Sequence, residues 1–386
     1  MIKNKDKRIY YLDYLKIILA ILVIIAHVCI AYSPRVWWFY KKPYPNIVYL
    51  RIYQLISAIV MNSFFFLFGY FIYNDYIQKG IKYFVKKRTK KYLVPIVISL
   101  PLVILPLSYL YHLMNRNMGF NKFKEYFIYV FMGFHKDINK FYDPYGAVFP
   151  ELKFSYLWFL EHCYIYTLIC AFIFFVIKKI KIQNTKFIII LVFVGICLTY
   201  IIRCKYDFDY WEGFLGFIQV EYCNIIKYIF SIILGIIISQ TELLEKIPRK
   251  LGIILFLSSI IFISIFIILS EKIPFVFAAG EAGWNTALWT VSDWLLCYSF
   301  LFGIIVVLRE YLSNKFSFLL SLSSLTMGVY LIHVPLMVII QYMMDKMKIE
   351  ISYRIILQSV LGTVISFVLV YIYKTKICKS VFGNNL

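Results

Sequence analysis

Long apolar stretches alternate with shorter polar connections over nearly the whole chain. Ten of them approach the ~20 apolar residues that an α-helix needs to cross the hydrocarbon layer of a bilayer. We expect transmembrane helices at residues 12–31, 52–74, 93–113, 157–177, 186–203, 218–239, 251–270, 287–308, 322–344 and 353–374. No linker or low-complexity segment interrupts the pattern. The sequence therefore predicts one all-α domain over residues 1–386, a polytopic transmembrane bundle of about ten helices.

The first apolar stretch contains three ionisable residues, Asp13, Lys16 and His27, at depths where charge is costly. At 100° per residue, the step from Lys16 to His27 returns to within roughly 20° of the same helix face, about 16 Å along the axis. Two interpretations are open. The histidine either makes a packing hydrogen bond between helices or faces a functional cavity.

Composition and charge fit a multi-pass protein of the cell membrane. Hydrophobic residues make up 62% of the chain, and 41 basic against 20 acidic residues give a net charge of +21. In a membrane protein such an excess marks cytoplasmic loops and lipid headgroup contacts, so we expect membrane lipids and no nucleic acid as partners. The basic residues gather at 75–92 and 178–186, which predicts that both termini are cytoplasmic.

Other ionisable residues fall at similar depths in the predicted helices. If successive helices run alternately outward and inward, the following lie in the outer half or near the middle of the bundle: Glu161, His162, Glu221, Asp293 and His333. Such groups normally face the bundle interior or a wet cavity. We therefore expect a polar cavity there. The alternative is a set of scattered interhelical hydrogen bonds.

The cationic segment before residue 93 also has two interpretations. It is the strongest topological signal in the chain, and its charges can lie on lipid phosphates. Alternatively, Arg88 and Lys91, with Lys87 beside them, bind the phosphates of a cytoplasmic ligand such as a nucleotide-bearing acyl carrier. The chain has no Walker or dinucleotide-binding motif and no zinc-type cysteine spacing, so we expect neither ATP hydrolysis nor a metal site.

The tryptophans lie in or near the predicted outer loops, as in an interfacial aromatic belt. Trp158 and Trp284 also have a second interpretation, contact with an acceptor. The stretch AAGEAGWN around Trp284 combines a stacking face with hydrogen-bonding groups of the kind that a sugar ring requires.

Several separated motifs together resemble the membrane acyltransferase-3 family, whose members O-acylate surface polysaccharides, glucans and other extracytoplasmic acceptors. The first helix resembles the family's basic residue and histidine with ten residues between them, here Lys16 and His27. Further motifs follow in order, the last four as in the branch that includes the osmoregulated-glucan succinyltransferases: SFFFLFGYFIY, KKRTKKYLVP, LWFLEHCYIYTLI, IIKYIFSIILGIIIS, GWNTALWTVSDWLL and MGVYLIHVPL.

The resemblance implies transfer of an acetyl-type or succinyl-type acyl group from cytoplasmic acyl-CoA to a hydroxyl of an extracytoplasmic glycan or similar acceptor. No permanently bound cofactor is expected. Such transfer needs a base or a nucleophile and a group that stabilises the developing oxyanion. We expect the catalytic residues to be His27, Lys16 and Glu161, and the acyl-CoA-binding residues to be Arg88, Lys91 and Lys87. Acceptor-contacting or supporting residues are expected to be Asp13, His333, Trp158, Asp293, Glu221 and Trp284.

The chain departs from the family pattern at three positions. Lys16 and Lys91 stand where arginine is commoner, which keeps the charge but weakens bidentate binding, and Phe68 stands where serine is usual. The competing functional class is a transporter or exporter component for a polysaccharide or small acid. Transporters are often built from internal repeats with interrupted helices, and the sequence has no such symmetry.

Overall fold

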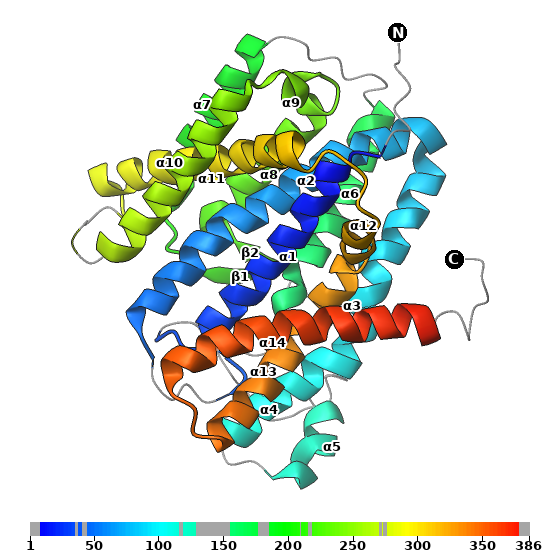
Figure 1. The fold of residues 1–386 in the computed structure, drawn as a ribbon, viewed down its shortest axis with the longest axis vertical. Coiled ribbons are helices and arrows are strands. Elements are labelled where there is room, and N and C mark those ends of the chain that lie inside the picture. The colour runs from blue at the N-terminus through cyan, green and yellow to red at the C-terminus, as the bar shows by residue number, and fades with distance from the viewer. Residues whose placement is uncertain are drawn as a thin grey trace.

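The computed structural model describes residues 8–34, 38–40, 45–115, 119–128, 155–176, 185–208, 210–214, 218–269, 272 and 276–377. Helices dominate this part of the chain, as predicted (Figure 1). The elements are α1 Tyr10–Ala31, α2 Ile47–Arg88, η1 Thr89–Leu93, α3 Val94–Ser99, η2 Leu100–Ile104, α4 Leu105–Asn115, η3 Phe120–Lys122, α5 Phe123–Tyr126, η6 Ser155–Leu157, α6 Trp158–Val176, α7 Thr185–Arg203, β1 Trp211–Phe214, β2 Ile218–Glu221, α8 Tyr222–Ile238, α9 Leu243–Lys246, α10 Arg249–Leu269, α11 Trp284–Tyr311, α12 Ser317–Ser323, α13 Thr326–Lys346, α14 Ile351–Ile372 and η7 Tyr373–Ile377.

Eight helical segments of the described chain are long and apolar enough to cross a bilayer. They are Tyr10–Ala31, Ile47–Ile77, Gly80–Met114, Ser155–Val176, Arg249–Leu269, Trp284–Tyr311, Thr326–Lys346 and Tyr353–Thr375. The other two predicted helices exist but are shorter, at Phe187–Arg203 and Tyr222–Ile238. The predicted all-α polytopic bundle is therefore confirmed.

The cationic segment at 75–92 is helical rather than an extended connection. The helix reverses at Gly80, whose φ of 73° lies in the left-handed region that glycine adopts without steric cost. The reversal brings the end of one span beside the start of the next, so Asp75 faces Lys87 and Arg88 across the turn. Two prolines distort the helix that follows. Because Pro95 and Pro101 lack a backbone N–H, the helix widens near them into the π-helical turns η1 and η2.

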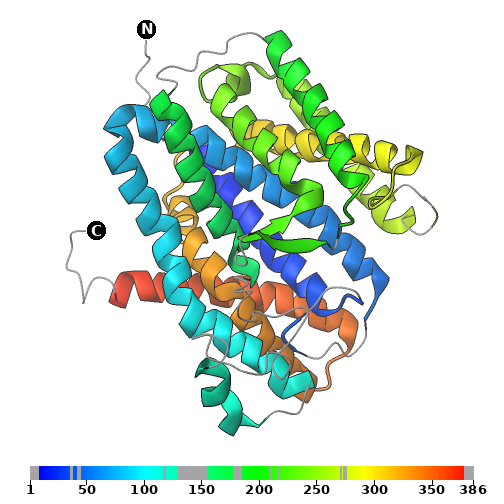
Figure 2. The same cartoon turned by 180° about the vertical axis from the view of Figure 1, so that it is seen from behind.

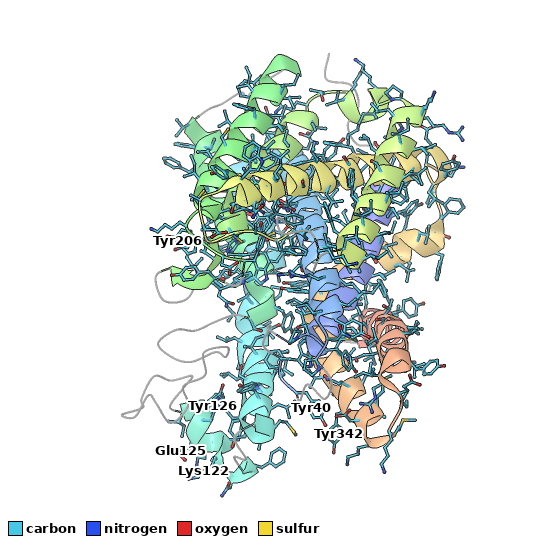
Figure 3. All side chains as sticks on the ribbon, turned by 90° about the vertical axis from the view of Figure 1, so that its left-hand side faces the viewer. Tyr40, Lys122, Glu125, Tyr126, Tyr206 and Tyr342 are labelled. Carbon is cyan, nitrogen blue, oxygen red and sulfur yellow. The ribbon has the colours of Figure 1, made fainter. Side chains whose placement is uncertain are left out.

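Helix α1 lies inside the bundle, packed against α2, α11, α12, α13 and α14 (Figure 1). Two buried glutamines fix its C-terminal end, since Trp38 Nε1 donates to Gln341 Oε1 at 2.6 Å and the Tyr32 hydroxyl donates to Gln358 Oε1 at 2.9 Å. Buried amides need such partners, so these bonds select one placement of α1 against α13 and α14. Tyr40 and Tyr342 pack edge to face near the same end (Figure 3).

Helices α2 and α8 cross at glycines. A Cβ on Gly69 would lie 2.1 Å from the carbonyl oxygen of Ile232, and one on Gly235 would lie 2.2 Å from that of Phe66. Small residues thus let the two backbones touch, as is common where helices pack in membranes. The close approach holds the aromatic run of α2 against the centre of the bundle.

A short antiparallel hairpin, β1 with β2, departs from the sequence prediction. Residues 218–221 were expected to begin a helix, but they pair with 211–214 in the register Trp211 to Glu221, and α8 begins one residue later at Tyr222. Figure 2 shows the hairpin in front of the bundle, beside α8. Two strands of four residues give too short an alternation of side chains to be recognised in sequence.

Candidate active site

Two histidines that lie 306 positions apart in the chain meet inside the bundle. The rings of His27 on α1 and His333 on α13 have centroids 4.7 Å apart, and His333 Nε2 lies 3.3 Å from His27 Nδ1. His333 is fully buried and His27 is half-buried. The structure therefore joins the predicted catalytic histidine to the one predicted to support it.

The hydrogen bonds of the two rings determine which nitrogens carry protons. His27 Nδ1 lies 2.9 Å from the carbonyl oxygen of Val23, and His333 Nδ1 lies 2.7 Å from that of Tyr330. A carbonyl oxygen only accepts, so each Nδ1 is a donor and the Nε2 of a neutral ring keeps an unshared electron pair. His27 thus presents Nε2 as its basic atom, while its Nδ1–H faces Val23 and the accepting Nε2 of His333.

Tyr156 packs on the histidine pair and donates a hydrogen bond to a carbonyl of α13 that a proline leaves without its helical donor. Pro335 has no N–H, so it cannot donate the usual helical bond to the carbonyl of Leu331. The Tyr156 hydroxyl donates to that carbonyl at 2.8 Å, and the Tyr330 hydroxyl donates back to the carbonyl of Tyr156. The Tyr156 ring packs against both imidazoles, with centroids 6.3 Å from His27 and 5.4 Å from His333.

A cavity of about 400 Å³ extends from the cationic reversal of α2 to His333. Its wall combines charged groups at the reversal with aromatic and small side chains from α1, α2, α6 and α13. The lining includes Lys16, Phe68, Phe71, Asp75, Lys87, Arg88, Lys91, Cys163, Tyr330 and His333. A cavity of this size is within the range of small-molecule sites.

The cationic end of this cavity contains an acid that the sequence prediction missed. Asp75 Oδ2 lies 2.5 Å from Arg88 Nη2, and Asp75 Oδ1 lies 3.1 Å from Lys87 Nζ. Arg88 is buried and also donates to the Tyr92 hydroxyl at 3.1 Å. Lys91 is exposed, and its ammonium lies 5.2 Å from the centre of the Tyr92 ring. Because Asp75 is the only acid in the basic segment 75–92, the sequence alone could have indicated that it pairs with the cations there.

Lys16 lies in the wall of the same cavity. Its ammonium is 2.8 Å from Asp13 Oδ1 and 4.5 Å from the centre of the Phe71 ring, and Arg8 Nε lies 2.5 Å from Asp13 Oδ2. Asp13 therefore fixes the Lys16 ammonium geometrically, as expected from their spacing. Lys16 and His27 do not share one cavity, although they lie on nearly the same face of α1.

A second cavity, of about 40 Å³, is lined by His27 together with Tyr156 and Trp158. Val23 and Tyr330 border both cavities. The histidine pair thus lies in the partition, with His333 on the wall of the large cavity and His27 on the wall of the small one. The small cavity exceeds the ~10–15 Å³ that one water requires, so it has room for a hydroxyl-bearing group.

Glu161 and Glu221 lie around the hairpin rather than in either cavity wall. The Gln219 N–H donates to Glu161 Oε2 at 3.4 Å, and His162 Nε2 donates to the Gln219 carbonyl at 2.6 Å. Glu161 Oε1 is buried without a hydrogen-bond partner in the described structure. Glu221 accepts hydrogen bonds from Asn224 at 2.7 Å and from the Tyr228 hydroxyl.

Burial raises the pKa of the Glu221 carboxyl, against the lowering effect of its hydrogen bonds from Tyr228 and Asn224. The Tyr228 ring in turn packs on Trp158, with centroids 5.8 Å apart. The rings of Tyr228 and Trp158 therefore connect Glu221 to the small cavity.

Asp293 and Trp284 lie away from the histidine pair. Asp293 Oδ2 lies 2.6 Å from Arg203 Nη2 and 2.5 Å from Lys227 Nζ, and all three side chains are fully buried. Arg203 and Lys227 were not predicted, although each is a basic residue in an apolar helix and so a candidate for a buried partner. Trp284 is 79% exposed at the start of α11. Neither Asp293 nor Trp284 borders the two cavities around the histidine pair.

Comparison with known families identifies the chain. The acyltransferase-3 model, described as an acyltransferase domain, matches residues 9–374. The chain belongs to this family. The expected enzyme class and multi-pass membrane character are thereby confirmed, and the protein is a membrane acyltransferase.

The curated relatives of this acyltransferase have low sequence identity to it. Glucans biosynthesis protein C of Escherichia coli strain SMS-3-5 / SECEC is 27% identical over 179 residues, and that of Shigella dysenteriae serotype 1 strain Sd197 is 25% identical over 181. Each match covers 45% of this chain and 40% of the relative, so the chain spans less than half the length of the relatives it matches. No solved structure matches.

Proposed function

We propose that this acyltransferase moves an acyl group of acetyl or succinyl type from cytoplasmic acyl-CoA to a hydroxyl of an extracytoplasmic glycan or related cell-surface acceptor. The observation that carries the proposal is the position of the histidine pair between a large cavity with a cationic end and a small cavity lined by aromatic rings. Similarity to glucans biosynthesis protein C supports a glycan as the acceptor.

The donor fits the large cavity in one orientation. Its phosphates bind at Arg88, Lys87 and Lys91, because cations at this end attract polyanions and Asp75 alone does not neutralise all three. The flexible arm of acyl-CoA runs past Phe68 and Phe71 toward His333. Lys16, held by Asp13, lies about 16 Å along α1 from His27, so in this proposal it lines the route of the donor and does not contact the reacting carbonyl.

The acceptor hydroxyl enters the small cavity and meets His27 Nε2. This nitrogen takes the hydroxyl proton while the oxygen attacks the thioester carbonyl carbon. The carbon–sulfur bond then breaks, and the proton on Nε2 passes to the leaving thiolate to give the free thiol. Positive charge on the His27 ring is stabilised by the Val23 carbonyl and by His333 Nε2, both of which accept from Nδ1–H.

A transiently acylated His27 is the alternative route. It uses the same nitrogen, because Nδ1 is held by its donor bond to Val23. Glu161 has a lesser proposed role, in which its buried Oε1 orients the acceptor through the hairpin, with Trp158 as the aromatic contact beside the hydroxyl.

The proposal is tested by supplying purified membranes with radiolabelled acetyl-CoA or succinyl-CoA, with and without a glucan acceptor. We expect acceptor-dependent loss of label from the thioester and its appearance as an ester on the glucan. Surface glycans from a deletion strain should lack the corresponding ester mass present in the parent. If membranes carry the glycan across without consuming either thioester, the transporter class is correct instead.

A further inference from the structure

A third hollow, outside both cavities, lies on the surface where the turn after α7 meets the segment before α11. Its volume is about 520 Å³, and it is lined by Lys205, Tyr206, Asp207, Tyr210, Ala279, Gly280 and Glu281. The Gly280 N–H donates to the Arg203 carbonyl at 2.7 Å, which joins the two segments. Gly280 has a φ of 88°, so the glycine permits the turn that brings Glu281 opposite Asp207.

Aromatic rings form one side of the hollow. Tyr206 and Tyr210 lie 5.1 Å apart at 31°, and Tyr206 stacks on Tyr222 at 4.7 Å and 23°. Tyr210 is 43% exposed, and Figure 3 shows Tyr206 at the edge of the molecule. Tyr210 and Tyr222 also lie 6.0 Å apart, so the three rings contact one another and their packing orders the aromatic surface.

Hydrogen-bonding groups stand beside this aromatic surface. The carboxylates of Asp207 and Glu281 are exposed at the hollow, and Asp207 Oδ1 accepts from the Phe208 N–H at 2.7 Å, which fixes its side chain. Carboxylates only accept hydrogen bonds, so they suit ligands with several hydroxyl donors. An ordered tyrosine face with adjacent acceptors fits a pyranose ring, which has an apolar face and hydroxyls around its edge. Two carboxylates against the one ammonium of Lys205 leave the lining net negative, which disfavours a lipid phosphate.

The hollow is connected to the active site by further aromatic residues. Tyr210 is followed directly by Trp211 on β1, whose ring lies 5.2 Å from that of Trp158. Trp158 borders the small cavity with His27. The start of the hairpin therefore links a residue that borders the hollow to one that contacts the wall of the small cavity.

We propose that the hollow at Tyr206, Tyr210, Asp207 and Glu281 is an acceptor subsite that binds one pyranose unit of a glycan while a more distant unit of the same glycan presents its hydroxyl to His27. The role of the hollow as an acceptor subsite rests on the proposed function, but the binding of a sugar there does not require catalysis. It extends the sugar-contacting interpretation of the AAGEAGWN stretch, since Gly280 and Glu281 line the hollow although Trp284 does not.

The test is calorimetric titration of the purified protein, without acyl donor, with a linear glucose heptamer. We expect saturable binding that weakens at least about fivefold in Tyr210→Ala, the loss expected for one aromatic stacking contact. Glu281→Gln, a milder change, should weaken binding by a measurable amount. Tyr371→Ala, which removes an exposed tyrosine from α14, should bind like the wild type.

Catalysis and binding separate cleanly in this design. His27→Ala should lose transfer yet keep saturable heptamer binding that Tyr210→Ala still weakens, so a failed catalytic assignment leaves the subsite result standing. Equal heptamer affinity in wild type, Tyr210→Ala and Glu281→Gln would overturn the subsite. Binding of a lysine heptapeptide in place of the sugar would also overturn it.

Discussion

Asp75 is the only acid among the described residues that line the large cavity, where four cations also lie. Its carboxylate binds both Lys87 and Arg88, the cations proposed to bind donor phosphates. A phosphate that enters must compete with this resident anion for Arg88, which is buried and holds no other acid in the described structure. Asp75 therefore holds Lys87 and Arg88 together and, under the proposed function, opposes donor binding.

We expect Asp75→Asn to lower the KM for acyl-CoA about fivefold with little change in kcat, since loss of a partly exposed ion pair is worth ~1 kcal/mol. Initial rates in membranes at varied donor concentration measure this. Glu310→Gln removes an acid that pairs with Arg309 outside both cavities, and should leave KM unchanged. A higher KM in Asp75→Asn would mean that Asp75 positions Arg88 for the donor.

At the residue scale, the sequence predicted contacts within one helix better than contacts between helices. The Asp13–Lys16 pair follows from helical spacing alone. The meeting of His27 with His333 does not, because it depends on how α1 packs against α13. Asp293 illustrates the same limit: its depth was predictable, but its partners Arg203 and Lys227 come from other helices.

At the scale of elements, α13 shows how a helix defect contributes to the site. Pro335 leaves the Leu331 carbonyl without its usual donor, and Tyr156 from the turn before α6 supplies one. This bond ties α6 to α13 at the depth of the histidines. The sequence predicted this helix, but nothing in the apolar pattern indicated which group would donate a hydrogen bond to the Leu331 carbonyl.

Tyr156→Phe should destabilise the protein by about 1–3 kcal/mol, because a buried carbonyl loses its donor. The unfolding midpoint in detergent should fall and activity should drop with it. Pro335→Ala in the same background restores an N–H at position 335 and should recover part of the lost stability. A Tyr156→Phe protein as stable as the wild type, or one that Pro335→Ala fails to improve, would show that the bond is unimportant.

Element boundaries show the limits of the hydrophobic pattern. It located the ten apolar helices of the described chain and the reversal between the second and third of them. It did not show that the reversal is a sharp turn at Gly80 with helix on both sides, and it missed the hairpin before α8. Both depend on a few residues of special backbone geometry or very short alternation, which a window of membrane length averages away.

At the scale of the molecule, the histidine pair separates two cavities. The cationic mouth of the large cavity belongs to the segment that predicts the cytoplasmic side, whereas the small cavity lies near Trp158 and the hairpin. Because His27 and His333 separate the two spaces, the account requires donor and acceptor to arrive from opposite sides of the membrane and to react at one imidazole.

The most direct measurement uses proteoliposomes with glucan trapped on one side and radiolabelled acyl-CoA added on the other. The wild type should form labelled glucan ester, and His27→Gln should slow this by about 10²–10⁴-fold, the usual contribution of a general base. His112→Gln, which alters a buried histidine of α4 away from both cavities, should retain the wild-type rate. Undiminished ester formation by His27→Gln would contradict the account.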